Sequence, residues 1–207
     1  MLLNSEFPVK NLVVSIKLRI FAAERLIMKS ICVENIMKGM PGITPIEGAN
    51  LYENAIVLLH KSEHVSPTKF KVTHTISEDF SLEWNDVFNE QMNRTYQDEQ
   101  SATERAAVCI SALLTVQLTD YTIIERSRKG TGFDYFLGNK ADKFFIPQAR
   151  LEVSGIAKET EQNLLTTRYR QKVEQTNISD QSSMPAYISV VEFKTPKAIY
   201  GKKEITR

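Results

Sequence analysis

The chain is poor in cysteine and histidine: its 207 residues include two cysteines and three histidines. Cys32 and Cys109 are far apart and lack the short spacing of a zinc site. Cys109 lies in an apolar helical run, where we expect a small core residue. Because nothing in this cysteine usage indicates an oxidising compartment, we expect a cytoplasmic protein.

An excess of charge of one sign is also missing, since 26 Lys and Arg residues stand against 25 Asp and Glu residues, for a formal net charge of +1. A general electrostatic attraction of the whole chain to nucleic acid is therefore excluded, and any such surface must be local. The sequence contains neither an internal repeat nor a low-complexity segment.

No long hydrophobic run is present either. Residues 11–20 alternate between apolar and polar side chains, and Lys17 and Arg19 interrupt a stretch far shorter than the ~20 apolar residues of a membrane span. The same segment lacks the uncharged core of a signal peptide. It is typical of a half-buried strand or of a basic amphipathic helix, and translation from Met28 would make residues 1–27 an upstream extension. We expect no membrane partner.

What is present is the balance of a globular protein, with 42% hydrophobic and 25% charged residues. At this length we expect one domain with an N-terminal addition. Residues 1–100 are predicted to be that addition, with a helix over about 47–62 and a β-hairpin from 69–76 and 80–84 packed on the core. Residues 101–207 are predicted to form the core itself.

The core has the sharper pattern. Helical and strand periodicities predict a helix at 101–118, strands at 121–126, 132–137 and 149–156, a helix at 160–176 and a strand at 186–193. Ser101 with Glu104 three residues later predicts a capping box at the first helix. Three consecutive strands, a crossover helix and a fourth strand predict an α/β (α+β) fold with a mixed central sheet flanked by helices. The basic segment 194–207 is expected to be loosely ordered or an edge strand.

Two carboxylates stand out in this core. Asp134 closes the glycine-bracketed turn GTGFD, and Glu152 lies inside the apolar run ARLEVSG. A carboxylate in a core strand is costly unless it is paired or bound to a metal. The alternation of side chains places both residues on one face of the sheet if their strands are neighbours. We therefore expect them to share a hard divalent cation, Mg²⁺ or Mn²⁺, which prefers oxygen ligands.

This element order and the acids in GTGFD and LEVSG resemble the PD-(D/E)XK nuclease superfamily, which includes many restriction endonucleases. The resemblance covers about residues 100–193 and implies a restriction-endonuclease-like αβββαβ core. It implies that Asp134 and Glu152 are catalytic metal ligands and that Glu104 is the extra acid many members carry on the preceding helix. The implied activity is metal-dependent endonucleolytic cleavage of DNA, in a restriction or phage-defence setting.

The sequence departs from the family pattern two residues after Glu152, where the family has a lysine and this chain has Ser154. A serine carries no charge and is a poor electrostatic substitute for that lysine. Lys172, on the following helix, and Lys129, in the glycine-rich turn, are the available replacements. Either the lysine has moved to one of these positions, or the site binds DNA without cutting it.

Basic residues near the two acids are candidates for DNA contacts. Arg126, Arg128 and Lys129 lead into the glycine-rich turn and could contact phosphates. Arg168 and Lys172 are four residues apart on one helix and could line a phosphate groove. We expect DNA as the partner, and an additional protein partner or a homodimer remains open.

The same acids also have structural explanations. Asp134 can cap a tight turn, and Glu152 can pair with Arg126 or Arg150. The protein would then be a catalytically inactive DNA-binding or assembly subunit of the nuclease fold, or an interaction protein of the immunity or antitoxin type. Two neighbouring carboxylates open to solvent beside a lysine would favour catalysis, whereas burial of both against arginines would favour these alternatives.

Overall fold

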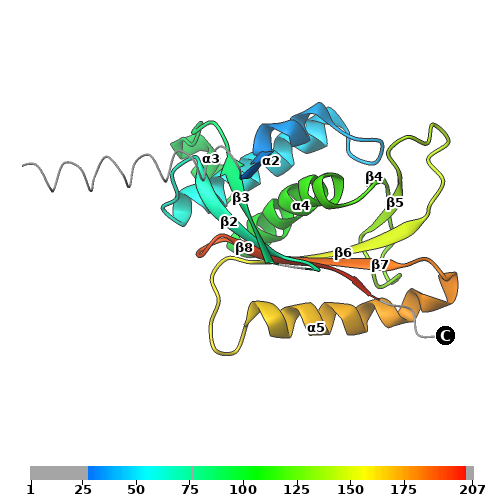
Figure 1. Cartoon of the computed structure of the whole chain (residues 1–207). Helices are drawn as coiled ribbons and strands as arrows, with labels where there is room; N and C mark the ends of the chain where they lie inside the picture. Colours follow the sequence, from blue (N-terminus) through cyan, green and yellow to red (C-terminus); the bar gives the residue numbers. More distant parts are fainter. Residues whose placement is uncertain (1–27, 76, 204–207) are drawn as a thin grey trace, which may run out of the picture.

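The structure, a computed structural model, describes residues 28–75 and 77–203, so the predictions for residues 11–20 lie outside it. Its centre is one sheet of eight strands in the order β1-β3-β2-β8-β7-β6-β5-β4 (Figure 1). The strands are β1 (Lys29–Cys32), β2 (Thr68–Thr73), β3 (Ser77–Glu83), β4 (Tyr121–Arg126), β5 (Tyr135–Asn139), β6 (Ala149–Ile156), β7 (Ala186–Glu192) and β8 (Lys197–Lys203). The sheet is mixed, because β1–β3, β2–β8 and β6–β7 pair in parallel while the other neighbours are antiparallel.

Helices cover both faces of this sheet (Figure 1). One face carries α2 (Pro45–Lys61) and α4 (Glu99–Leu118), and the other carries α5 (Leu165–Gln175) and the 3-10 helix η2 (Thr176–Ser182). Two shorter helices, η1 (Val33–Lys38) and α3 (Glu90–Thr95), also lie within the described residues. The predicted mixed sheet flanked by helices is therefore confirmed.

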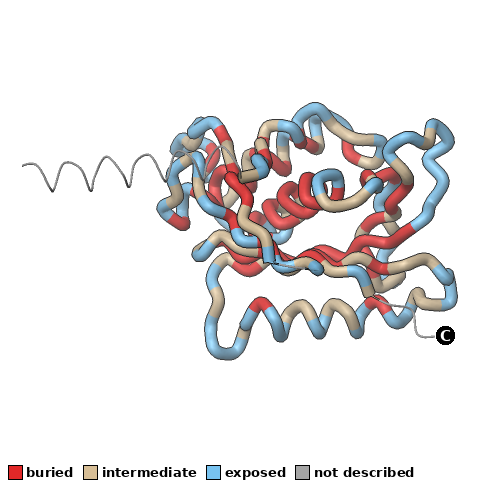
Figure 2. The backbone as a smooth tube through the Cα atoms, viewed as in Figure 1, coloured by how far each residue is buried: buried red, intermediate tan, exposed pale blue. Residues whose placement is uncertain are grey.

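Helix α4 lies between the sheet and α2 and is buried on nearly every side (Figure 2). Its small and aliphatic residues, among them Ala106, Ile110 and Leu114, permit this because no polar face has to reach water. The predicted capping box is wrong: the N-cap is Asp98, whose Oδ1 accepts a hydrogen bond from the Ser101 N–H at 3.2 Å. The helix therefore begins at Glu99, two residues before the predicted start, and Glu104 has no capping role.

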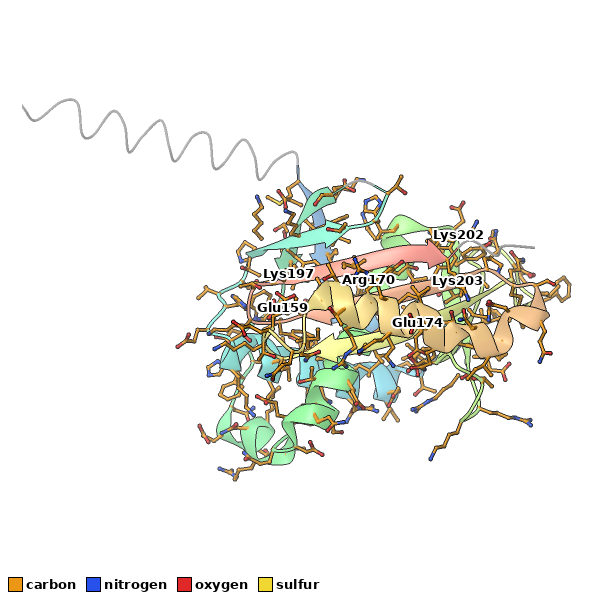
Figure 3. All side chains as sticks on the ribbon, turned by 90° about the horizontal axis from the view of Figure 1, so that it is seen from below. Glu159, Arg170, Glu174, Lys197, Lys202 and Lys203 are labelled. Atoms are coloured by element: carbon orange, nitrogen blue, oxygen red, sulfur yellow. The ribbon has the colours of Figure 1, made fainter. Side chains whose placement is uncertain are left out.

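Helix α5 is amphipathic instead. Leu165, Tyr169 and Val173 pack on the sheet, at positions separated by four residues. Arg170 and Glu174 lie on another side of the helix and are exposed (Figure 3). The helix therefore has one apolar side on the sheet and one polar side toward solvent.

The predicted element order is confirmed between Glu99 and Glu192, where α4, β4, β5, β6, α5 and β7 follow one another. Strand β5 begins at Tyr135, later than predicted. The expectation for the last segment is wrong, because β8 is an interior strand that pairs antiparallel with β7 and parallel with β2. Its buried Ala198 and Tyr200 belong to the larger core cluster, while Ile199 between them packs against the smaller one, which is the pattern of a strand covered on both faces.

The pairing of β5 with β6 ends early and leaves a fork. Tyr135 pairs with Leu151, but β6 continues to Ile156 with a partner on its β7 side. The backbone N–H of Asp134 still donates to the Leu151 carbonyl at 2.9 Å. Beyond that point the Asp134 side chain continues the contact, since its Oδ2 accepts from the Val153 N–H at 2.8 Å.

Candidate functional site

A cavity of about 430 Å³ opens at this fork, between the N-terminal half of α4, the edge of β6 and α5. It is lined by Leu51, Ser101, Glu104, Arg105, Val108, Arg126, Asp134, Tyr135, Val153, Ser154, Arg168 and Lys172. Five of the eight residues that the sequence nominated for catalysis or DNA contacts therefore meet here. Arg128 and Lys129 are exposed in the turn and do not line the cavity, and Glu152 lies beneath its wall.

The glycine-rich turn positions Asp134. Gly132 has a φ of +80°, a backbone conformation that favours glycine. A Cβ at Gly132 would lie 2.6 Å from the carbonyl oxygen of Gln175 at the end of α5. The absence of a side chain thus lets the turn approach α5, and the chain enters β5 with Asp134 at the fork.

Glu152 is the most buried carboxylate of the site, with a relative exposure of 1%. Its Oε1 accepts hydrogen bonds from Lys172 Nζ at 2.6 Å and from Gln175 Nε2 at 2.9 Å. Its Oε2 is buried and has no hydrogen-bond partner among the described residues. A carboxylate oxygen in this condition is costly, and a cation or a proton would relieve the cost.

The pKa values of Glu152 and Asp134 also favour a cation at this site. Burial, followed by the nearby charge of Asp134, raises the pKa of Glu152 to about 7, although Lys172 opposes the shift. Burial also raises the pKa of Asp134, although the hydrogen bond from the Val153 N–H and the charge of Lys172 oppose this shift. Burial thus disfavours the charged form of both carboxylates, and Asp134 further disfavours that of Glu152, so a divalent cation would stabilise this site.

The donor set fits a hard cation in part. Asp134 and Glu152 supply carboxylate oxygens, which Mg²⁺ and Mn²⁺ prefer. Within residues 28–75 and 77–203, no group of three or more His, Cys, Asp or Glu side chains could hold a metal ion. Water and a substrate phosphate would therefore have to provide the other ligands, as is usual for Mg²⁺.

The cationic wall of the cavity is held in place by hydrogen bonds. Arg168 Nη1 donates to Ser154 Oγ at 3.2 Å, and its Nη2 donates to Asn163 Oδ1 at 2.8 Å. Ser154 thus anchors an arginine at the cavity. Such an oriented guanidinium is suited to a phosphate group.

Sequence reasoning missed two residues of the site. Arg105 lines the cavity one position after Glu104, and Gln175 contacts Glu152 from a position three residues after Lys172. The helical i, i+3 spacing of Gln175 from Lys172 was the available signal for the second. Nothing in the sequence distinguished Arg105 from other helix arginines.

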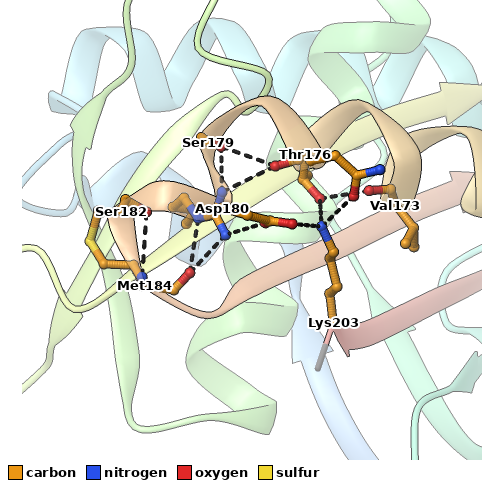
Figure 4. Close-up of polar contacts among 9 residues, drawn as sticks. Val173, Thr176, Ser179, Asp180, Ser182, Met184 and Lys203 are labelled. Atoms are coloured by element: carbon orange, nitrogen blue, oxygen red, sulfur yellow. Dashed lines mark hydrogen bonds and ion pairs between the residues drawn. The ribbon is translucent and has the colours of Figure 1, made fainter. Parts of the chain in front are cut away.

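The alternative in which Glu152 pairs with Arg126 or Arg150 is wrong, because its partners are Lys172 and Gln175. Arg150, two residues earlier on the same face of β6, is fully buried and pairs with Asp180 at 3.0 Å. Asp180 in turn accepts from Lys203 at 2.6 Å (Figure 4). Lys172 takes the place beside Glu152 because α5 crosses β6 there, whereas η2 covers Arg150.

Replacing the buried acid should stabilise the protein in a pH-dependent way. Between about pH 4.5 and pH 7 the unfolded chain has released the Glu152 proton while the folded protein retains it, so this group lowers stability as pH rises. In EDTA, Glu152→Gln should exceed wild type by about 1–3 kcal/mol at pH 8 and by little at pH 4. Urea unfolding at both values, with exposed Glu104→Gln as the matched control, measures this. The same difference at both pH values would contradict the assignment.

No protein-family model matches this chain, and comparisons with curated proteins and with solved structures found no match. None of the helices in the described part of the chain is long and apolar enough to cross a membrane.

Proposed function

We propose that the protein is a metal-dependent DNA endonuclease, with its active site at the β5–β6 fork. The observation that carries the proposal is the meeting of Asp134, Glu152 and Lys172, which come from the turn before β5, from β6 and from α5. The order of α4, β4, β5, β6, α5 and β7 supports it, because the same order is implied by the nuclease resemblance. The restriction or phage-defence setting rests on that resemblance alone.

The chemistry assigns a role to each side chain. Asp134 and Glu152 would hold Mg²⁺ or Mn²⁺, which when bound lowers the pKa of a water and neutralises charge on a phosphate. The unpaired Oε2 of Glu152 and the raised pKa of both acids fit this role. Arg126 and Arg168 line the cavity and would orient the phosphate.

Lys172 replaces the lysine that the family carries on the strand. Its Nζ is 2.6 Å from Glu152 Oε1, and the side chain also lines the cavity. From there the ammonium group can stabilise negative charge on the attacked phosphate. Lys129, the other replacement that the sequence offered, is in the exposed turn outside the cavity lining.

The proposal that Lys172 replaces the strand lysine can be tested by placing a lysine at position 154. Lys172→Met should lower the cleavage rate by about a hundredfold, because a preorganised positive charge is lost. Adding Ser154→Lys in that variant should restore part of the rate, since Ser154 lines the same cavity. Single-turnover cleavage at saturating protein is the measurement. A double variant that folds but is no faster than Lys172→Met alone would show that the two positions do not serve one reaction.

A catalytically inactive DNA-binding subunit is the second candidate. One observation favours it: Glu152 is 1% exposed and its Oε1 is occupied by Lys172 and Gln175. An ion pair closed in this way can be structural. In that case DNA would bind along the arginines of the cavity without being cut.

Incubation with supercoiled and linear DNA separates the two candidates. The nuclease proposal expects nicked or linear products with Mg²⁺ or Mn²⁺, and intact DNA with EDTA. DNA that is retained in a binding assay but stays intact with both metals would refute cleavage and support the inactive subunit. Failure both to bind and to cut would refute both candidates and favour a role in protein interaction.

A further inference from the structure

A second cavity, of about 360 Å³, adjoins the candidate active site. The two cavities share Ser101 and Arg105 on α4, so one residue layer separates them. The second cavity lies between the first turns of α4, the first half of α2 and the end of α3. A ligand that reaches past Arg105 would therefore occupy both.

The chemistry of the two cavities differs. The first is lined by four cations, Arg105, Arg126, Arg168 and Lys172, against two acids, Glu104 and Asp134. In the second the charge is mainly negative, from Glu47 and Asp98. Its arginine is already engaged, since Arg105 donates to Glu47 Oε2 at 2.8 Å and to Asn50 Oδ1 at 2.6 Å. A phosphate is thus favoured in the first cavity and disfavoured in the second, which suits a neutral group that donates hydrogen bonds.

Asn54 supplies the second, independent observation. It lines this cavity and is 1% exposed. Its Nδ2 donates to the Asn50 carbonyl at 2.7 Å, whereas its Oδ1 is buried without a hydrogen-bond partner. Within residues 28–75 and 77–203, two buried side-chain atoms are left in this state, Asn54 Oδ1 and Glu152 Oε2. One belongs to each of the neighbouring sites, and an unsatisfied acceptor of this kind calls for a donor.

We propose that the second cavity binds a nucleobase of the DNA substrate, one that presents an exocyclic amino group as adenine and cytosine do. The amino group donates to Asn54 Oδ1, and the phosphate of the same nucleotide lies in the first cavity on the other side of Arg105. This inference rests on the proposed function and names the part of the substrate that the site reads. Amide side chains are a common means of recognising such bases, and an unpaired or extruded base can enter a cavity of this kind.

Nucleotide pairs that differ only at the amino group test the inference. The probes are dAMP against dIMP and dCMP against dUMP, each competing in EDTA with a fluorescent single-stranded oligonucleotide. For at least one pair, the nucleotide with the amino group should bind about tenfold more tightly, because its analogue turns a carbonyl toward Asn54 Oδ1. Asn54→Leu should reduce this ratio below about twofold, while exposed Asn35→Leu should leave it unchanged. Arg168→Ala should weaken all four nucleotides to a similar extent.

The outcomes separate this inference from the proposed function, because binding is measured without metal. Equal affinity within both pairs would overturn the nucleobase site, even if the protein cleaves DNA. Discrimination that survives Asn54→Leu would also overturn it. Discrimination that Asn54→Leu removes, in a protein that never cleaves, would support the site and refute the nuclease. If Asn54→Leu does not fold, the comparison within each pair on wild-type protein still decides.

Discussion

Asp134→Asn should reduce metal-dependent DNA cleavage by at least about a thousandfold relative to wild type. The change removes one of two carboxylates that would hold the cation, and a neutral amide is a much weaker ligand. The fold should survive, because the asparagine oxygen can still accept from the Val153 N–H that Asp134 now binds at 2.8 Å. Burial also disfavours the charge of Asp134, so its removal should not destabilise the protein.

The measurement is single-turnover cleavage of a plasmid in Mg²⁺, with DNA binding followed in parallel. Asp86→Asn, an exposed change of the same chemistry, is the matched control and should cleave like wild type. Binding by Asp134→Asn should be equal or tighter, since a negative charge near the phosphate is gone. A variant that cleaves within tenfold of wild type would remove Asp134 from the active site.

Arg150→Ala should lower the free energy of unfolding by about 3–5 kcal/mol. The guanidinium is fully buried and donates to the Met184 carbonyl at 2.8 and 3.0 Å, to the Thr176 carbonyl at 3.2 Å and to Ser179. It also pairs with Asp180 at 3.0 Å. Removing it leaves a large void and several acceptors without donors in the region shown in Figure 4.

Urea unfolding measures this loss. Arg170→Ala, an exposed arginine on α5, should stay within about 0.5 kcal/mol of wild type. Arg150→Met should be less damaging than Arg150→Ala because it fills more of the void. A loss below about 1 kcal/mol for Arg150→Ala would show that water replaces the guanidinium without cost. Since η2 follows α5 directly, the same change should loosen the end of α5 that carries Gln175.

The elements of the core were predictable because their periodicities are local. The apolar run from Ala106 to Leu114 and the apolar strands need no distant partner to be recognised. The place of β8 was not predictable, because KAIYGKK is short and basic and its pairing is decided by β2 and β7. The start of α4 was missed because Asp98 competes with Ser101 as a cap, and Asp98 prevails.

The candidate site was predictable where it depends on the order of residues within a single strand or helix. The alternation of side chains was enough to place Asp134 and Glu152 on one face of the sheet. The position of Lys172 on the following helix was enough to nominate it for the same site. The hydrogen-bond and ion-pair partners of the β6 side chains were not predictable, because they depend on where α5 and η2 cross β6. Arg150 and Glu152 are equivalent in the sequence pattern, yet one contacts Asp180 and the other contacts Lys172. The second cavity joins α2, α3 and α4, and no short motif spans all three.

The interior position of β8 has a consequence for the order of assembly during synthesis. The β2–β3 hairpin and β1 join the rest of the sheet through β8, whose neighbours are β2 and β7. Residues 197–203 leave the ribosome after the other strands of the described part of the chain, so the two halves of the sheet cannot be joined until β8 has been synthesised. Until then β2 and β7 each present an unpaired edge, and the nascent chain is exposed to wrong strand pairing at both.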